Sequence, residues 1–266
     1  MQTQNSYKKP IQDVKVVIAV SSGKGGVGKS TVAVNLAVSL AMTGAKVGLL
    51  DADIHGPNIP AMMGLKETPR TQGENEKPML IPLVAHGVKF MSIGLMLERD
   101  QPVIWRGPML HRIVNQFCHQ VAWGELDYLV VDMPPGTGDI QLSLAQLVPV
   151  SGTVLVTTPQ EVSLQDVSKA FMMWKKVEVP VLGIIENMSY FKCDQCNKEH
   201  RIFGAGGGKK LAEEFKMDLL AELPLISQVR EGGDLGQPIV IANPNLEIAK
   251  LFYHLAEKVI TLLKMN

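Results

Sequence analysis

A glycine-rich loop that ends in lysine and serine is the strongest chemical signal in the chain. Residues 23–30, GKGGVGKS, fit the pattern G-x-x-x-x-G-K-[ST] throughout, with an apolar run before them and a helical pattern after them. Glycines allow backbone N–H groups to turn inward around phosphate oxygens. We expect Lys29 to reach the β- and γ-phosphates of a nucleotide, the Ser30 hydroxyl to bind Mg²⁺, and Thr31 to contact the α-phosphate. The residues expected to contact the nucleotide are Gly23, Lys24, Gly25, Gly26, Val27, Gly28, Lys29, Ser30 and Thr31.

Aspartates that could complete a magnesium site follow two apolar runs. Asp132 ends the run YLVVD, as a Walker-B aspartate does, and Asp51 and Asp53 end the run LLDAD. Because ligands bind at the carboxyl edge of a parallel sheet, we expect all three carboxylates near the phosphates. Asp51 or Asp53 could orient the attacking water or bind magnesium through water; we assign catalysis to Asp53 and cofactor binding to Asp51 and Asp132. The alternatives are a strand-terminal cap for Asp132 and a solvated turn for the other two.

A C-x-x-C pair, Cys193 and Cys196, supplies two thiolates, whereas an iron–sulfur cluster or a tetrahedral zinc needs four ligands. A two-fold axis through the site would double two cysteines to four, and so few bonds per chain would make a bound cluster labile. A structural zinc in the same four thiolates remains open, and a redox dithiol is less favoured because the pair lies in a loop pattern. His200 is better explained by a local hydrogen bond than as a ligand, and Cys118 by burial in a helix.

Short apolar runs alternate with helical patterns along the chain, which predicts an α/β fold with a mostly parallel sheet and helices on both faces. The expected strands cover residues 14–20, 46–51, 127–132, 152–158 and 179–187. The expected helices cover residues 30–44, 108–122, 163–177 and 246–264, the last with an apolar stripe for the core. Residues 66–78 and 190–208 are predicted loops.

Composition sets the broad class. The chain has 266 residues, 46% of them hydrophobic, so one large domain with a real core is expected: a flexible tail over residues 1–13 and one domain over residues 14–266. Lysine plus arginine and aspartate plus glutamate balance at 26 each, which argues against nucleic acid as a partner. The polar N-terminus, the absence of a run of about 20 apolar residues and the three cysteines predict a cytoplasmic protein with no membrane partner.

The phosphate loop also resembles a known family. GKGGVGKS is similar to the deviant Walker A motif of the SIMIBI-class P-loop ATPases, a class that includes the nitrogenase iron protein and the MinD/ParA ATPases. Three further stretches, DADIHGPNIPAMMGL, VVDMPPGTGDIQLSLAQ and ENMSYFKCDQCNKEHRIFGAGGG, resemble the Mrp/ApbC branch, the iron–sulfur cluster carriers. The resemblance runs from about Val14 to Leu263.

The resemblance implies a single P-loop NTPase domain that binds ATP or ADP and hydrolyses ATP slowly with Mg²⁺. It implies a homodimer in which Lys24 reaches the partner's phosphates, where a cation stabilises charge developing on the γ-phosphoryl group. It implies that Asn187 recognises adenine beside residues 222–238, and that Cys193 and Cys196 hold a labile 4Fe-4S cluster between subunits. Apo iron–sulfur proteins would then receive the cluster.

Two departures from the family pattern and two alternative functions complete the sequence-based expectations. Family members often carry a small domain before the ATPase or a four-cysteine site, whereas residues 1–117 contain no cysteine, so we expect no second cluster. A positioning ATPase of the MinD/ParA kind would carry a basic amphipathic C-terminal helix, and HLAEKVITLLKMN has few cations. A small-molecule kinase would need a second pocket that no motif marks. Arg106 is better explained by a surface ion pair than by a phosphate contact.

Overall fold

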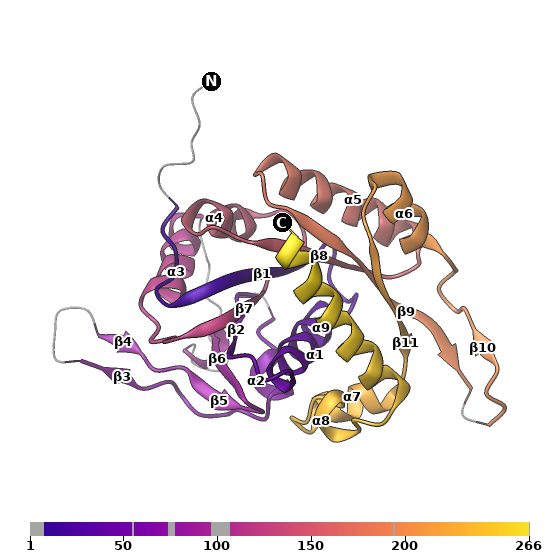
Figure 1. The fold of residues 1–266 in the computed structure, drawn as a ribbon, viewed down its shortest axis with the longest axis horizontal. Coiled ribbons are helices and arrows are strands. Elements are labelled where there is room, and N and C mark those ends of the chain that lie inside the picture. Colours follow the sequence, from indigo (N-terminus) through magenta and orange to yellow (C-terminus); the bar gives the residue numbers. More distant parts are fainter. Residues whose placement is uncertain (1–7, 55, 74–77, 97–106, 194, 266) are drawn as a thin grey trace.

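The computed structural model describes residues 8–54, 56–73, 78–96, 107–193 and 195–265. A central sheet in this part follows the order β10-β9-β8-β1-β7-β2-β6-β5, with β11 also paired to β9 (Figure 1). The parallel strands are β1 (Val14–Ser22), β2 (Val47–Asp51), β6 (Val88–Ser92), β7 (Leu126–Asp132), β8 (Gly152–Thr157), β9 (Val181–Lys192) and β11 (Leu219–Leu225). The antiparallel strands are β5 (Leu83–Ala85) and β10 (Glu199–His200), and β3 (Thr71–Gln72) and β4 (Met79–Leu80) form a separate ribbon.

Helices cover both faces of the sheet, and each face has its own hydrophobic core. On one face lie α1 (Lys29–Met42), α2 (Ile59–Met62), α8 (Ile239–Ala242) and α9 (Glu247–Met265). On the other lie α3 (Gly107–His119), α4 (Asp139–Leu147), α5 (Glu161–Lys176) and α6 (Gly207–Phe215). The remaining helices are α7 (Ser227–Asp234) and the 3₁₀ turn η1 (Ile93–Leu95). Buried strands without polar alternation, such as β8, are typical of a sheet covered on both sides. The predicted α/β class with a mostly parallel sheet is therefore confirmed.

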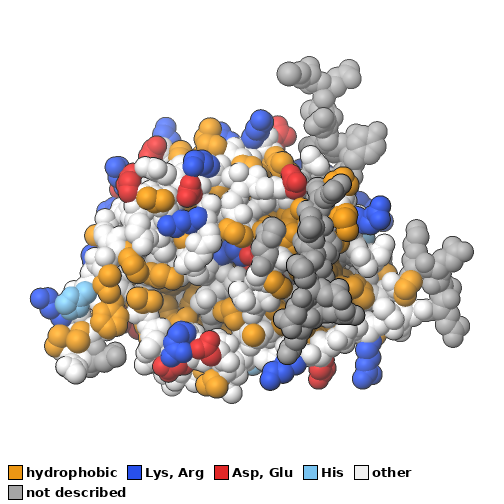
Figure 2. Space-filling view, turned by 180° about the vertical axis from the view of Figure 1, so that it is seen from behind, with side chains coloured by type: hydrophobic (Ala, Val, Ile, Leu, Met, Phe, Trp, Pro, Cys, Tyr) orange, Lys and Arg blue, Asp and Glu red, His pale blue; other side chains and the backbone are white. Residues whose placement is uncertain are grey.

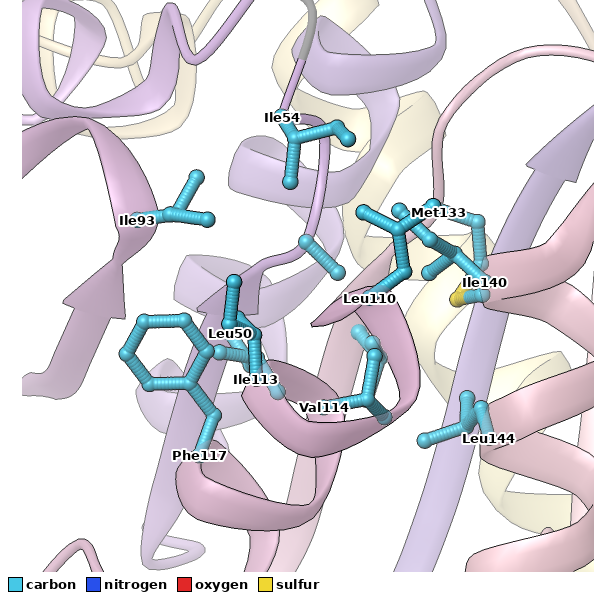
Figure 3. A pocket seen from close by; sticks show the side chains of 12 residues that line it. Leu50, Ile54, Ile93, Leu110, Ile113, Val114, Phe117, Met133, Ile140 and Leu144 are labelled. Carbon is cyan, nitrogen blue, oxygen red and sulfur yellow. The ribbon is translucent and has the colours of Figure 1, made fainter. Parts of the chain in front are cut away.

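Apolar side chains fill the space between α3, α4 and the ends of β2 and β7 (Figure 3). A residual cavity of about 10 Å³ remains there, and its lining carries no polar side chain. Space of this size and character is a packing feature rather than a place for a charged ligand. The residues labelled around it include Leu50, Ile113, Phe117, Met133 and Leu144.

Most predicted elements are found within a few residues of their expected bounds, and both predicted loops need correction. The predicted loop over residues 66–78 contains the two-residue strand β3, which pairs with β4. The predicted loop over residues 190–208 is only partly a loop, because β9 continues to Lys192 and pairs with β10 in an antiparallel hairpin. A two-residue strand such as β10 is too short to show the alternation of apolar and polar residues that marks a strand in the sequence. The apolar stripe of the last helix is buried at Leu255 and Val259, as predicted.

The N-terminal segment is described from Lys8 onward. Lys9 N donates a hydrogen bond to Leu147 O at 2.9 Å, and the Ile11 side chain is buried. These residues of the predicted tail therefore lie against the body of the molecule. Residues 1–7 and Arg106 lie outside the described residues. None of the helices in the described ranges has the length and apolar character needed to cross a bilayer.

The two outer edges of the sheet are short or covered. At one edge β5 has three residues. At the other, β11 contains Pro224, which has no N–H to offer, and the Lys258 ammonium from α9 donates a hydrogen bond to Leu220 O at 2.9 Å. On its other side, β9 extends past β8 and pairs with the two-residue strand β10, since Phe191 pairs with Leu225 of β11 and with His200 of β10.

Candidate functional site

The loop between β1 and α1 needs glycine at two positions for two different reasons. Gly28 caps α1 with φ of 83°, and a Cβ there would lie 2.2 Å from the Asn187 amide nitrogen. At Gly23 a Cβ would lie 2.1 Å from the carbonyl carbon of Asp166 in α5. The motif glycines thus allow the loop to pack against both β9 and α5.

The structure brings Lys29, Ser30, Asp53 and Asp132 together at the carboxyl ends of β1, β2 and β7. Lys29 Nζ donates to Asp132 Oδ1 at 2.8 Å and lies 3.6 Å from Asp53 Oδ2. The Ser30 hydroxyl donates to Asp132 Oδ2 at 2.7 Å. Lys29 and Asp132 are both buried, so the ion pair is shielded from screening by salt. Lys29 and Ser30 from the motif and Asp132 from the apolar run therefore form one polar cluster with Asp53.

Asp51 lies behind this group and does not line the cavity in front of it. Its carboxylate accepts hydrogen bonds from the Ser92 hydroxyl at 2.8 Å and from Asp53 N at 3.1 Å. Burial, followed by the nearby charge of Asp132, raises the pKa of Asp51 to about 8. Burial raises the pKa of Asp132 as well, but Lys29 and Ser30 act in the opposite direction. Asp51, which forms no ion pair among the described residues, therefore keeps its proton near neutral pH. Ser92 carried no signal in the sequence.

Stability of the nucleotide-free chain should depend on this proton. The folded chain keeps it up to a pKa of about 8, whereas the unfolded chain releases it near 3.8, so the free energy of unfolding falls as pH rises between these values. We expect the thermal midpoint to drop between pH 6 and pH 8, and Asp51→Asn, which carries no charge, to reduce that drop. Asp127→Asn, at the exposed amino end of β7, is the control and should keep the wild-type slope. Equal slopes in wild type and Asp51→Asn would contradict the assignment.

Two adjoining cavities extend from the glycine-rich loop. The first, about 420 Å³, is lined by the loop, Lys29, Ser30, Asp53 and Pro135. The second, about 510 Å³, is lined by Asn187 and by residues from the β11–α7 region, including Pro224, Ile226 and Arg230. Four residues, Gly28, Thr31, Asn58 and Met62, line both, so the cavities form one continuous groove. The first cavity, with its lysine and inward N–H groups, suits a phosphate chain. The second, with its mixed apolar lining, suits an aromatic base.

The sequence predicted one wall of the second cavity and missed the other. Residues 222–238 were expected to flank a base, and several of them line the cavity with Asn187. The opposite wall comes from α2 and includes Ala61 and Met62, which were not among the predicted site residues. The α2 and α7 regions meet where a Cβ on Gly236 would lie 2.4 Å from Gly64 Cα. No local sequence pattern predicts this approach, because 171 residues separate the two glycines.

Lys24 lies at the mouth of the first cavity. Its side chain is half-buried and lines the cavity wall, and its carbonyl accepts a hydrogen bond from the Ser22 hydroxyl at 3.0 Å. No carboxylate among the described residues pairs with its ammonium group. A lysine in this position can bind an anionic group that approaches from another molecule.

Cys193 and Cys196 lie in the turn of the β9–β10 hairpin. Cys193 N donates to Lys198 O at 3.0 Å, and Asn197 N donates back to Cys193 O at 2.8 Å. Cys193 is half-buried and Cys196 is exposed. The pair does not sit at a helix N-terminus, the position that a redox dithiol favours. Burial raises the pKa of Cys118 to about 12, which leaves that thiol unreactive, as its predicted burial implies.

The described residues of the hairpin do not complete a metal site within one chain. Among the described residues, no three His, Cys, Asp or Glu side chains gather closely enough to hold a metal ion, and this includes His200 on β10. Figure 2 shows the molecule from behind, with the hairpin end at the left, where hydrophobic side chains gather beside it. Ile202 and Leu225 are exposed hydrophobic residues of this region. A surface of this kind is typical of a contact with another molecule.

Comparisons with known proteins agree with this arrangement. The family model ParA, described as NUBPL iron-transfer P-loop NTPase, matches residues 13–260. The chain is 53% identical to an iron-sulfur cluster carrier protein from Synechocystis over 95% of its own length and 72% of that relative. A nucleotide-binding protein from Archaeoglobus fulgidus, solved in complex with ADP, superposes with a TM-score of 0.78 at 38% identity over 94% of this chain and 97% of that one. MinD from Pyrococcus furiosus shares the fold, with a TM-score of 0.69 at 23% identity over 93% and 99% of the two chains.

Proposed function

Because this chain belongs to the ParA family of NUBPL-type iron-transfer P-loop NTPases, we propose that it is an ATP-hydrolysing iron–sulfur cluster carrier. Two copies would bind a labile 4Fe-4S cluster between them and pass it to apo-proteins. The observation that carries the proposal is a phosphate groove combined with a cysteine pair that, among the described residues, lacks the further ligands a metal needs. No other proposed activity needs both.

The groove supports nucleotide binding residue by residue. The N–H groups of Gly25, Gly26 and Gly28 and the positive end of α1 would hold the phosphates. Lys29 would leave Asp132 and contact the β- and γ-phosphates. Asn187, which now donates to Val27 O at 2.9 Å, would bind the adenine in the second cavity. The Archaeoglobus relative was solved in complex with ADP, which supports nucleotide binding by this fold.

The donor set at the loop also fits magnesium. The Ser30 hydroxyl and Asp132 Oδ2 lie 2.7 Å apart, and both are the hard oxygen ligands that Mg²⁺ prefers. Ser30 would bind the ion directly, with Asp132 and Asp51 behind it. When bound, the ion would neutralise charge on the β- and γ-phosphate oxygens.

Hydrolysis would use Asp53 as the residue that orients water. The water oxygen forms a bond to the γ-phosphorus, the bond to the β–γ bridging oxygen breaks, and the water proton ends on the phosphate product. Asp53 is buried at the cavity wall within 3.6 Å of Lys29, so it reaches the end of the phosphate chain. Lys24 of a partner subunit would add positive charge at the γ-phosphoryl group, which would explain why Lys24 lines the cavity without a carboxylate partner among the described residues.

The cysteine hairpin supports a cluster shared by two copies. Cys193 and Cys196 give two thiolates, and a two-fold axis gives the four that a 4Fe-4S cluster needs. The exposed hydrophobic residues beside the hairpin, Ile202 and Leu225, would be covered in that pairing. A cluster held at such an exposed turn remains accessible to a recipient protein.

Anaerobic reconstitution with iron and sulfide tests the proposal. We expect visible absorption of a cluster and about two iron and two sulfide per chain. Sedimentation velocity should show a dimer of the reconstituted, ATP-loaded chain, and transfer to an apo-protein acceptor should follow. One zinc per two chains without colour would instead indicate a structural metal site, and a colourless monomer would contradict both.

A further inference from the structure

One strand, β9, joins the base cavity to the cysteine hairpin. Asn187 lines the cavity from the middle of β9, and Cys193 follows the last residue of the same strand. Asn187 is tied to the glycine-rich loop through its bond to Val27 O. Any change at Asn187 therefore has a covalent route of six residues to the first cysteine.

That route is interrupted by an irregularity between its two ends. Asn187 pairs with Leu223 and Phe191 pairs with Leu225, so a step of four residues on β9 faces a step of two on β11. Met188 within this bulge has φ of 55°, an uncommon conformation for a residue with a side chain. Such a residue persists only where the surrounding structure determines its conformation.

A buried carboxylate holds the bulge in place. Glu186 is fully buried, and its Oε1 accepts a hydrogen bond from the Ser189 hydroxyl at 2.6 Å, across the bulged residues. Its Oε2 accepts from Gly208 N at 2.5 Å, in the first turn of α6. The carboxylate thus satisfies a backbone donor of α6 and a side chain of β9 at once.

The same contacts continue toward the hairpin. The Ser189 hydroxyl lies 3.3 Å from Glu222 Oε1 on β11, and Arg201 Nη1, directly after β10, lies 3.9 Å from that oxygen. Glu186, Ser189, Glu222 and Arg201 thus form a polar chain from α6 across β9 and β11 to the base of the hairpin. The buried part of this chain is Glu186 and Ser189.

We propose that Glu186 and Ser189 are positioning residues that couple nucleotide binding at Asn187 to the conformation of the cysteine hairpin. This inference rests on the proposed function, since it assigns the pathway by which the nucleotide affects the cluster site. A base that bonds to the Asn187 amide competes with Val27 O for that amide and displaces β9 at the position before Met188. Because Glu186 and Ser189 fix both sides of Met188, the displacement reaches Cys193 rather than being absorbed in the bulge.

Hydrogen exchange of the metal-free chain with and without ADP measures this coupling. In wild type we expect ADP to slow amide exchange about threefold or more both in the glycine-rich loop and in residues 190–200, where Cys193 N and Asn197 N are hydrogen-bonded. In Ser189→Ala, ADP should still protect the loop, but the response of residues 190–200 should be lost. Glu186→Gln should reduce that response in the same way.

Ser168→Ala is the matched control, because it removes a serine hydroxyl whose one partner among the described residues is Leu164 O within α5. It should keep the wild-type response at the hairpin. A merely structural role of Ser189 would speed exchange equally with and without ADP, leaving the ratio unchanged, and that result would overturn the inference. A wild-type hairpin that ignores ADP would overturn it too. Both measurements use the metal-free chain, so they test the coupling alone. Failure of the proposed carrier function would instead appear in the reconstitution with iron and sulfide.

Discussion

Lys29→Ala is expected to abolish ATP hydrolysis and to weaken ADP binding by roughly 100-fold or more, equivalent to about 3 kcal/mol. Lys29 is the buried cation of the phosphate cavity, with its Nζ 2.8 Å from Asp132 Oδ1. Its removal leaves the carboxylates of Asp132 and Asp53 to face the phosphates without compensation. Calorimetric titration with ADP and a phosphate-release assay measure the two effects.

The matched control is Lys46→Ala, an exposed lysine paired with Glu125 near the amino end of β7. It should bind ADP and hydrolyse ATP as wild type does. Because Lys29→Ala also leaves a buried carboxylate without its cation, thermal unfolding must show that the variant is folded before its affinity is interpreted. A folded Lys29→Ala chain with wild-type affinity for ADP would contradict the assignment of the cavity to phosphate.

Cys193→Ala is expected to remove nearly all iron from the reconstituted chain while leaving its affinity for ADP unchanged. The variant takes one of two thiolates from each subunit, and two remaining thiolates do not hold a four-iron cluster. Iron and sulfide counted per chain after anaerobic reconstitution, together with visible absorption, measure the loss. Cys196→Ala should behave alike.

Cys118→Ala is the control for this experiment, since that thiol is buried in α3, far along the chain from the hairpin, and its pKa is raised to about 12. It should retain the full iron content. If Cys193→Ala keeps its iron, or if Cys118→Ala loses it, the hairpin is not the cluster site and the carrier proposal fails.

The sequence predicted the parts of this molecule that have local signals. Apolar runs such as VKVVIAV and YLVVD mark buried parallel strands because neither face of the sheet meets water. The phosphate loop was evident because its chemistry is confined to eight consecutive residues. The structure places Lys29, Ser30 and Asp132 in contact at the carboxyl edge of the sheet, where the sequence analysis expected them.

What sequence reasoning missed depends on contacts between distant segments. β11 contains Glu222 and Pro224 and lacks the continuous apolar pattern of its neighbours, so it was included in a segment expected to flank the base and not identified as a strand. β10 has two residues and exists only because β9 extends beside it. Glu186 looked like an ordinary strand-end residue; its burial is tolerated because a serine three residues later and a helix terminus satisfy both oxygens.

The outer strands of the sheet have a consequence for how copies of the chain can aggregate. An exposed strand with free backbone groups invites further chains to add without limit, as in amyloid. Here one margin ends in the three-residue β5, and the other carries a proline and a carbonyl already engaged by Lys258. Growth by backbone pairing is disfavoured at both margins, so the proposed pairing of two copies can form through side chains without seeding fibres.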